Sequence, residues 1–287
     1  MNKTPFDHRD AMPEESDGIG RRRFITTSVA VGFAAAVQPV MADAIHTGSD
    51  GIVAGEVKVK VPDGEIPAYR AYPAKGNSPF PIILVAHEIF GVHEYIQDVC
   101  RRLAKLGYFA ISSDLYSRQG DVSKIDNIKD ILANVVSKVS DQQFLGDLDA
   151  TVAYASSTGK GDGKRLGITG FCWGGRVTWM YAAHNPKVKA GVAWYGPLGG
   201  APEKAVINHA SEIKGAVLGL YGGKDTGIPM EDVEKMRAAI KGGKSEIVVY
   251  PEAPHGFHAD YRPSYDATAA ADGWNRLETW FKLHGVA

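Results

Sequence analysis

Apolar runs that alternate with helix-like stretches constrain the fold of this chain more than any other feature of its sequence. The apolar runs are residues 80–88, 108–116, 165–171, 188–196, 216–223 and 245–253. Helix-like patterns follow them at 95–107, 125–158, 175–184, 230–241 and 267–284. Strands that are apolar on both faces and are each followed by a helix indicate an α/β fold, with a mostly parallel central sheet and helices on both faces.

A hairpin is predicted ahead of these runs. Residues 55–72 contain two extended pieces separated by Pro62, Asp63 and Gly64, which are typical turn residues. Neither an internal repeat nor a low-complexity linker interrupts the chain after it. We therefore expect residues 45–287 to form a single domain.

Composition and charge exclude some classes of function. The 287 residues are 44% hydrophobic and carry a formal net charge of −1, without a basic stripe, so we expect a globular protein that does not bind nucleic acid. Cys100 and Cys172 are too few for a disulfide scaffold and form no C-x-x-C pair. Cys100 has helical spacing with Ile96, Val99 and Leu103, which predicts a buried core thiol.

Residues 1–44 are typical of an export signal. Arg21, Arg22 and Arg23 precede an apolar run over 25–40, and small residues follow it. The arginines resemble a twin-arginine signal, although Gly20 and Thr26 depart from its usual flanks, and an ordinary secretory signal is the alternative. The run is short for a membrane span, so we expect contact with the export machinery, no stable membrane insertion, and a location outside the cytoplasm, in the periplasm.

The segment Gly170-Phe171-Cys172-Trp173-Gly174 joins an apolar run to a helical pattern. It has the G-x-nucleophile-x-G spacing of a nucleophile elbow, with cysteine in the place usually held by serine. The glycines suit a strained turn with close neighbours, and the following helix N-terminus favours a thiolate. Alone, the pattern also fits a buried structural thiol.

Two further residues follow Cys172 in the order expected of a catalytic triad. Asp225 comes after the run 216–223, and His255 comes after the run 245–253. Loops at the carboxyl ends of parallel strands meet at one edge of the sheet, which is where such folds build their sites. We expect His255 to accept the thiol proton and Asp225 to orient the imidazole.

At this point the chain resembles the dienelactone hydrolase (carboxymethylenebutenolidase) family of the α/β-hydrolase superfamily. The motifs are "GFCWGG", "GGKD", "PHGF", "LVAHEIFGVHEYIQD" and "DLYSRQGD". The resemblance implies that Glu88 contacts the resting thiol and helps to activate it, and that the Ile89 N–H joins that of Trp173 in an oxyanion hole. It also implies that Arg118 pairs with a substrate carboxylate, as a guanidinium can do in a bidentate way.

The loop after His255 departs from the family pattern. Ala259 stands where a second substrate-binding arginine is expected, and Arg262, three residues further on, is a candidate replacement. We therefore expect the substrate to be a related ester or lactone rather than the small dienelactone after which the family is named. Tyr116, His258 and Tyr261 are candidate pocket residues.

These residues predict a hydrolase of carboxylic esters or lactones that works through a thioester and needs no metal or cofactor. The alternative is a non-catalytic α/β-hydrolase-like protein that binds a ligand, or senses oxidation through Cys172. A binding protein has no need of Asp225 and His255 in triad order, which favours the enzyme.

Overall fold

The computed structural model describes residues 44–202 and 204–287. The predicted export signal, residues 1–44, lies outside this range apart from its last residue. Among the described residues, no helix is both long enough and apolar enough to cross a lipid bilayer.

Eight strands within the described ranges form one sheet in the order β1-β2-β4-β3-β5-β6-β7-β8. The antiparallel edge is made by β1 (Ile52–Val61), β2 (Gly64–Pro73) and β4 (Phe109–Ser113). The remaining neighbours pair in parallel; they are β3 (Phe80–Ala86), β5 (Gly161–Phe171), β6 (Val188–Trp194), β7 (Ala216–Gly222) and β8 (Glu246–Tyr250). The predicted hairpin and the mostly parallel sheet are both confirmed.

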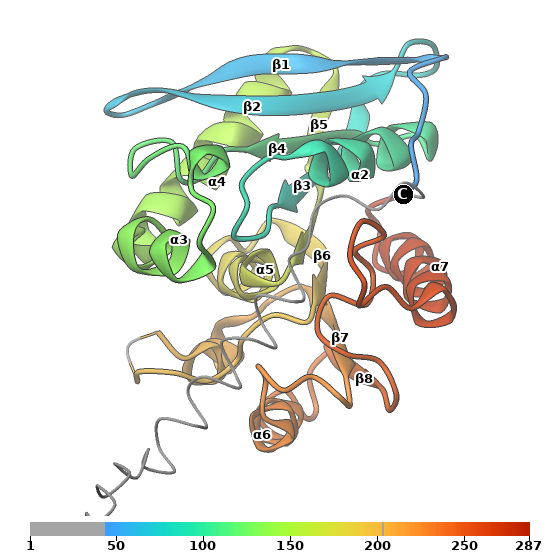
Figure 1. Ribbon diagram of the computed structural model, residues 1–287. Coiled ribbons are helices and arrows are strands. Elements are labelled where there is room, and N and C mark those ends of the chain that lie inside the picture. Colours follow the sequence, from blue (N-terminus) through green and yellow to red (C-terminus); the bar gives the residue numbers. More distant parts are fainter. Residues whose placement is uncertain (1–43, 203) are drawn as a thin grey trace, which may run out of the picture. The chain divides into compact units, whose positions relative to one another are not determined.

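The strands at the centre are apolar throughout because both faces of the sheet are covered. Every residue of β3, β4 and β7 is buried. The helices α4 (Asp141–Ser157) and α5 (Trp173–His184) pack side by side on one face, and α2 (Glu94–Lys105) and α7 (Ala267–Leu283) lie on the other (Figure 1). Helix α6 (Met230–Ala239) packs beside β8 at the edge.

The stretch 125–158, predicted as one helical region, is broken. It forms α3 (Ile128–Asn134), a 3₁₀ turn η2 (Val136–Lys138) and then α4. Ser140 caps α4 by accepting a hydrogen bond from the Gln143 N–H at 3.1 Å, which marks a new helix start. Two more 3₁₀ segments, η1 (Val122–Lys124) and η3 (Val206–Glu212), complete the described elements.

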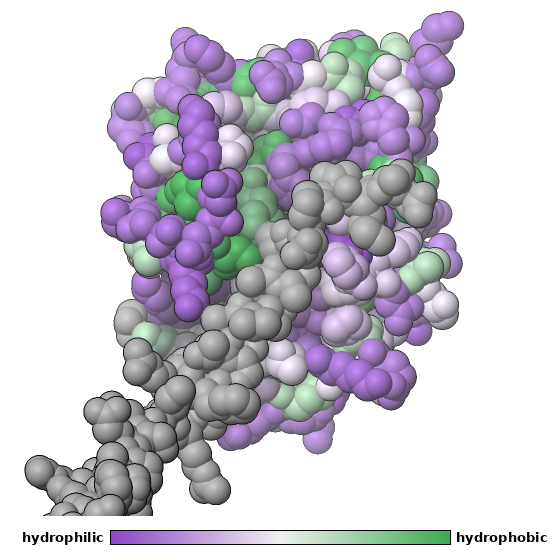
Figure 2. Space-filling model, viewed as in Figure 1, coloured by the Kyte–Doolittle hydropathy of each residue, from purple (hydrophilic) through white to green (hydrophobic). Residues whose placement is uncertain are grey.

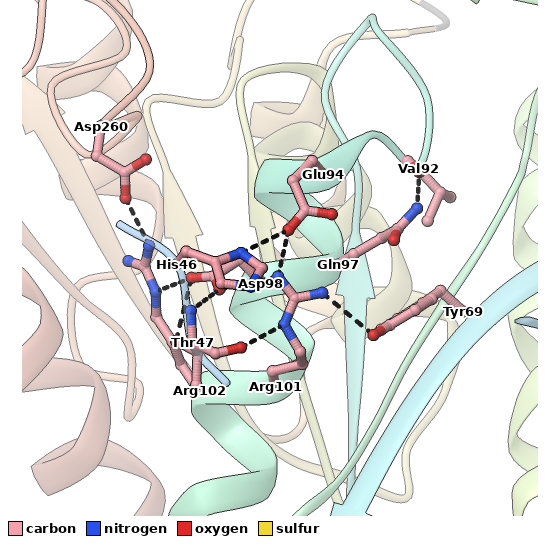
Figure 3. A network of polar contacts seen from close by, with 10 residues as sticks. All are labelled: His46, Thr47, Tyr69, Val92, Glu94, Gln97, Asp98, Arg101, Arg102 and Asp260. Carbon is pink, nitrogen blue, oxygen red and sulfur yellow. Dashed lines mark hydrogen bonds and ion pairs between the residues drawn. The ribbon is translucent and has the colours of Figure 1, made fainter. Parts of the chain in front are cut away.

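A buried network on α2 anchors two other parts of the chain (Figure 3). Asp98, 1% exposed, accepts hydrogen bonds from the Thr47 N–H, from Arg101 at 3.0 Å and from Arg102 at 2.5 Å. Arg102 in turn donates to Asp260 at 2.5 Å, in the loop that follows β8. The network thus holds the loop that carries His255 against α2. Nearby on the same helix, Cys100 is fully buried, as predicted.

Candidate active site

Cys172 lies in a sharp turn between β5 and α5. Its backbone has φ 55° and ψ −119°, a conformation that side chains other than glycine rarely adopt. Its N–H donates to the Trp194 carbonyl at 3.0 Å, and its carbonyl accepts from Gly175 at 2.9 Å. Strain of this kind concentrates at functional sites and holds the side chain away from the helix that follows.

The neighbouring glycines are required by close backbone contacts. A Cβ at Gly170 would lie 2.1 Å from the Gly174 carbonyl oxygen, and one at Gly174 would lie 2.1 Å from the Ala86 carbonyl oxygen. Backbone atoms of strands and helices cannot shift to make room for such a group. The glycines thus bring the start of α5 directly against the end of β3, where the Glu88 loop begins.

Asp225 and His255 meet at the carboxyl ends of β7 and β8. The Nδ1 atom of His255 lies 2.7 Å from Oδ2 of Asp225, whose side chain is 1% exposed. The other Asp225 oxygen accepts the Gly227 N–H at 2.8 Å. An aspartate fixed in this way orients the imidazole and stabilises its protonated form.

The third member of the predicted group, Cys172, acts directly on this imidazole. Burial alone would lower the pKa of His255, but the charge of Cys172, the hydrogen bond that His255 donates to Asp225 and a hydrogen bond with Cys172 together raise that pKa to about 10. The structure therefore brings the thiol, the imidazole and the carboxylate into one chain of contacts. These contacts favour the protonated form of the His255 imidazole.

Two backbone amides are the predicted oxyanion donors. Among the described residues, neither the Ile89 N–H nor the Trp173 N–H donates to a backbone carbonyl. Trp173 is the first residue of α5, where helix N–H groups have no partner within the helix. Ile89 follows β3 in a turn closed by the Gly91 N–H on the Glu88 carbonyl. Both amides are thus available to a ligand oxygen.

The structure places Glu88 among three polar partners, and its contact with the resting thiol stays a prediction. Its buried carboxylate lies 3.0 Å from the Arg262 guanidinium, and its other oxygen accepts from Tyr261 at 2.6 Å and pairs with His93 at 3.3 Å. Burial raises the pKa of Glu88, but the charge of Arg262 and the bonds from His93 and Tyr261 outweigh it and lower the pKa to about 2. A buried guanidinium needs a counter-charge, and Glu88 supplies it.

Arg262 is the charged partner of Glu88, and its expected role in binding substrate stays a prediction. Its guanidinium is 3% exposed, donates to the Tyr261 hydroxyl at 2.9 Å, and stacks over the rings of Phe90 and Tyr261. Burial lowers the pKa of Arg262, but the charge of Glu88 outweighs it and raises that pKa above the usual value. In this structure Arg262 holds Glu88.

The structure places Arg118 between two carboxylates of the chain itself. Its guanidinium binds Asp63 of the hairpin turn through two hydrogen bonds of 2.6 Å. Two more, of 2.8 and 2.9 Å, go to Asp147 of α4. Both edges of the guanidinium are thus engaged within the chain, and the pairing of Arg118 with a substrate carboxylate stays a prediction.

Tyr116, a candidate pocket residue, lies near enough to Cys172 to feel its charge. It is fully buried, with its ring 4.8 Å from that of Trp173 and 4.7 Å from that of His87. Burial and the nearby charge of Cys172 raise the pKa of its hydroxyl well above 10. Within the described residues, that buried hydroxyl has no hydrogen-bond partner. The neutral hydroxyl of Tyr116 is thus available to donate a hydrogen bond to a ligand.

Tyr195 and His93 are site residues that the sequence reasoning missed as such. Tyr195 directly follows β6 with φ 40°, and its ring meets the His255 ring edge-on at 5.1 Å. Its position depends on the β6–β7 pairing and on no local motif. His93 directly precedes α2 and pairs with Glu88 at 3.3 Å. His258, by contrast, packs among Phe171, Trp194 and Trp274, and burial lowers its pKa to about 3.

One group of side chains on α2 has the spacing of metal ligands. Atoms of His46, Glu94 and Asp98 lie within 4.8 Å of one another. The Arg101 guanidinium contacts both carboxylates, at 3.0 Å in the case of Asp98 (Figure 3). A cation already fills the place between them, so this donor set is an ion-pair network.

A cavity of about 1040 Å³ lies at the other end of the sheet. It is lined by residues that precede β3 and begin β5 and β6, among them Pro79, Asp162 and Lys189. These residues stand at the amino ends of the parallel strands, opposite the edge at which Cys172 and His255 lie. The chemistry therefore belongs to the carboxyl edge.

The fold and the elbow define the class of protein. A mostly parallel eight-stranded sheet with helices on both faces, and a sharp turn between β5 and α5 that carries Cys172, make this an α/β-hydrolase-like chain. The sequence model of the dienelactone hydrolase family matches residues 66–285. The chain belongs to the dienelactone hydrolase family, a family of hydrolases.

Relatives of known sequence cover nearly the whole chain. A protein of Methylorubrum extorquens provisionally named carboxymethylenebutenolidase is 60% identical over 276 residues, which is 94% of either chain. An Escherichia coli K12 protein with the same provisional name is 49% identical and covers 91% of this chain and 98% of its own.

The fold also matches a solved structure. A crystal structure from Klebsiella pneumoniae, provisionally described as a dienelactone hydrolase, is 50% identical. It superimposes with a TM-score of 0.79 over 81% of this chain and 99% of that one.

Proposed function

We propose that this protein hydrolyses a carboxylic ester or lactone through a Cys172-His255-Asp225 triad and a thioester acyl-enzyme. The single observation that carries the proposal is the chain of contacts from Asp225, 2.7 Å from the imidazole, through His255 to Cys172 in its strained turn. The position of the triad at the carboxyl edge of the sheet supports it.

The first half of the reaction forms the thioester. The Cys172 sulfur attacks the carbonyl carbon, and the carbonyl electrons move to oxygen, where the amides of Ile89 and Trp173 would donate to the oxyanion. When the carbonyl re-forms, the C–O bond to the alcohol breaks, and the protonated His255 gives its proton to the departing oxygen.

The second half releases the acid. His255, now neutral, takes a proton from water while the water oxygen attacks the thioester carbon. The C–S bond breaks, the acid leaves, and the sulfur and imidazole return to their starting state. Asp225 keeps the imidazole oriented in both halves, and Tyr116 offers its buried hydroxyl to the substrate.

The test is pre-steady-state kinetics with p-nitrophenyl acetate, followed by mass spectrometry of the acid-quenched protein. We expect a burst of p-nitrophenol and an acetyl group on the Cys172 peptide that disappears as substrate runs out. Cys172→Ser should lose most of the turnover. Cys100→Ser is the matched control, since Cys100 is the other buried thiol and lies on α2, and it should keep burst and adduct.

A folded, reduced protein with neither burst nor adduct would contradict ester hydrolysis. Retained ligand binding in Cys172→Ser without any turnover in the wild type would favour the binding alternative. Modification of Cys172 by peroxide in the same protein would favour the redox alternative.

We further propose that residues 1–44 direct export and that the rest of the chain works outside the cytoplasm, in the periplasm. Arg21, Arg22 and the apolar run after them support this. Cell fractionation should find the wild type in the periplasm and the Arg21→Lys, Arg22→Lys double variant in the cytoplasm. An unchanged distribution in the double variant would exclude the twin-arginine route, and a wild type found in the cytoplasm would exclude export.

A further inference from the structure

The arginines that could bind a substrate carboxylate are each bound by carboxylates of this chain. Arg118 makes four hydrogen bonds of 2.6–2.9 Å to Asp63 and Asp147. These bonds use both edges of the guanidinium, so a third carboxylate could bind only by displacing one of the two aspartates. With two carboxylates on one guanidinium, the group as a whole is negative.

The second arginine is no more available. Arg262 is 3% exposed, and its charge faces the Glu88 carboxylate at 3.0 Å. The rings of Phe90 and Tyr261 lie 5.1 Å from the guanidinium carbon and cover it. Removing Glu88 from this contact would leave a buried charge without a partner, which is costly.

The triad adds no free positive charge. Asp225 is negative, and Cys172 with His255 is neutral in sum, whether the pair is thiol and imidazole or thiolate and imidazolium. Together, the Arg118 group, the Arg262 pair and the triad carry an excess of negative charge. A carboxylate entering this region would lose hydration and meet no uncompensated cation.

What surrounds the thiol is aromatic. The rings of Tyr116, Trp173 and His87 contact one another, and Phe144 packs on Trp173. Burial lowers the pKa of His87, which keeps that ring neutral. Figure 2 shows an apolar patch between α3 and α2, surrounded by hydrophilic side chains. The loop between β3 and α2 lies on the same face. Such walls favour uncharged groups.

Resting on the proposed function, we infer that this hydrolase takes esters or lactones whose acyl portion is uncharged, because its own carboxylates Asp63, Asp147 and Glu88 neutralise the two arginines that could bind a substrate carboxylate. Asp63 and Asp147 thereby act as specificity-determining residues. A substrate acid is rejected by charge, while a neutral ester of the same shape is accepted.

The test compares two substrates that differ in one charge. p-Nitrophenyl hydrogen adipate and its methyl ester share the same acyl chain and leaving group, but the first carries a distal carboxylate. We expect kcat/KM to be about tenfold or more higher for the methyl ester at low ionic strength. Added salt should shrink the ratio, because it screens the repulsion.

Two charge variants test whether Asp63 and Asp147 cause the preference for the uncharged ester. Asp63→Asn, at an exposed turn, and Asp147→Asn, on α4, each release one edge of Arg118, so both should raise kcat/KM for the hydrogen adipate relative to the methyl ester. Asp63→Asn keeps the test valid if the buried Asp147→Asn fails to fold. Asp162→Asn is the matched control, since it frees Arg165 at the opposite edge of the sheet, and it should leave the ratio unchanged.

Three outcomes would overturn the inference. In the first, the wild type hydrolyses the hydrogen adipate at least as fast as its methyl ester, and both esters acylate Cys172. The proposed function would then stand, and the charge argument would fail. An unchanged ratio in both Asp63→Asn and Asp147→Asn would remove the role given to those residues. Acylation by neither ester would overturn the proposed function, and this inference with it.

Discussion

The carboxylate of Glu88 and the guanidinium of Arg262 lie 3.0 Å apart, with side chains that are 0% and 3% exposed. Glu88 follows β3 and Arg262 lies in the loop after β8, so this pair joins segments that are far apart in the sequence. It also fixes Tyr261, which bonds both partners. The ion pair is thus the link between the Glu88 loop and the His255 loop on either side of Cys172.

Breaking this pair from one side should be strongly destabilising. Glu88→Gln leaves the Arg262 charge buried without a counter-charge, and we expect a loss of about 3–5 kcal/mol in the free energy of unfolding. The double variant Glu88→Gln, Arg262→Met lacks both charges, so its loss of stability should be clearly smaller than the sum of the losses in the single variants Glu88→Gln and Arg262→Met. Urea unfolding of the wild type and these three variants measures the coupling energy of the pair. Additive losses would show that the pair contributes nothing.

The pair also sets the response of stability to acid. Because the pKa of Glu88 in the folded protein is lowered to about 2, its contribution is present above the unfolded value of about 4.5 and is lost as pH falls through that window. Wild type should therefore lose stability between about pH 4.5 and 2 more steeply than Glu88→Gln, Arg262→Met. Equal slopes in urea unfolding at a series of pH values would contradict the lowered pKa.

The elbow glycines should not tolerate a methyl group. Gly174→Ala places Cβ 2.1 Å from the Ala86 carbonyl oxygen, so we expect loss of several kcal/mol or failure to fold, and loss of activity. Gly146→Ala, within α4 and with nothing within 4 Å of the new Cβ, is the matched control. It should gain about 0.5–1 kcal/mol, as expected for a helix interior. Thermal unfolding and ester turnover measure both, and an active, stable Gly174→Ala would disprove the close approach.

Sequence alone predicts the framework here because the framework is encoded locally. Apolar runs place the strands within a few residues, and the turn residues place Cys172, Asp225 and His255 at one edge of the sheet. The break at Ser140 was missed although its capping signal is local as well. The charge pairs could not be predicted in this way. Arg118 binds Asp63, which is 55 residues away, and no local pattern records which carboxylate a fold brings to a guanidinium.

The loop after β8 depends on its anchor to α2. Asp260 accepts a hydrogen bond from Arg102 at 2.5 Å and directly precedes Tyr261 and Arg262. We expect Asp260→Asn to cost about 1–3 kcal/mol, because it weakens a largely buried charged hydrogen bond. It should also lower kcat/KM by letting Tyr261 and Glu88 shift. Glu231→Gln, in an exposed helix pair with Lys235, is the control and should leave stability almost unchanged. Equal effects of the two variants on stability and turnover would argue against the anchor.

The protonation of His255 offers the most direct view of the proposed chemistry. The charge of Cys172 and the bonds with Asp225 and Cys172 outweigh burial and raise the pKa of His255 from 6.5 to about 10. A raised pKa stabilises the fold fully below the unfolded value of about 6.5, and this contribution is lost as pH rises toward 10. Removing the sulfur in Cys172→Ala removes a main cause of the rise, so the pKa should fall by about one unit or more. Cys100→Ala should leave it unchanged.

Nuclear magnetic resonance titration of the imidazole in the reduced protein gives these values directly. In the wild type, acylation should also weaken above about pH 10, because a neutral His255 has no proton to give to the departing alcohol. A His255 pKa near 6.5 in the wild type, or one that is the same in Cys172→Ala, would show that thiol and imidazole do not share a proton. The nucleophile would then need another source of activation, and Glu88 could supply it only by leaving Arg262.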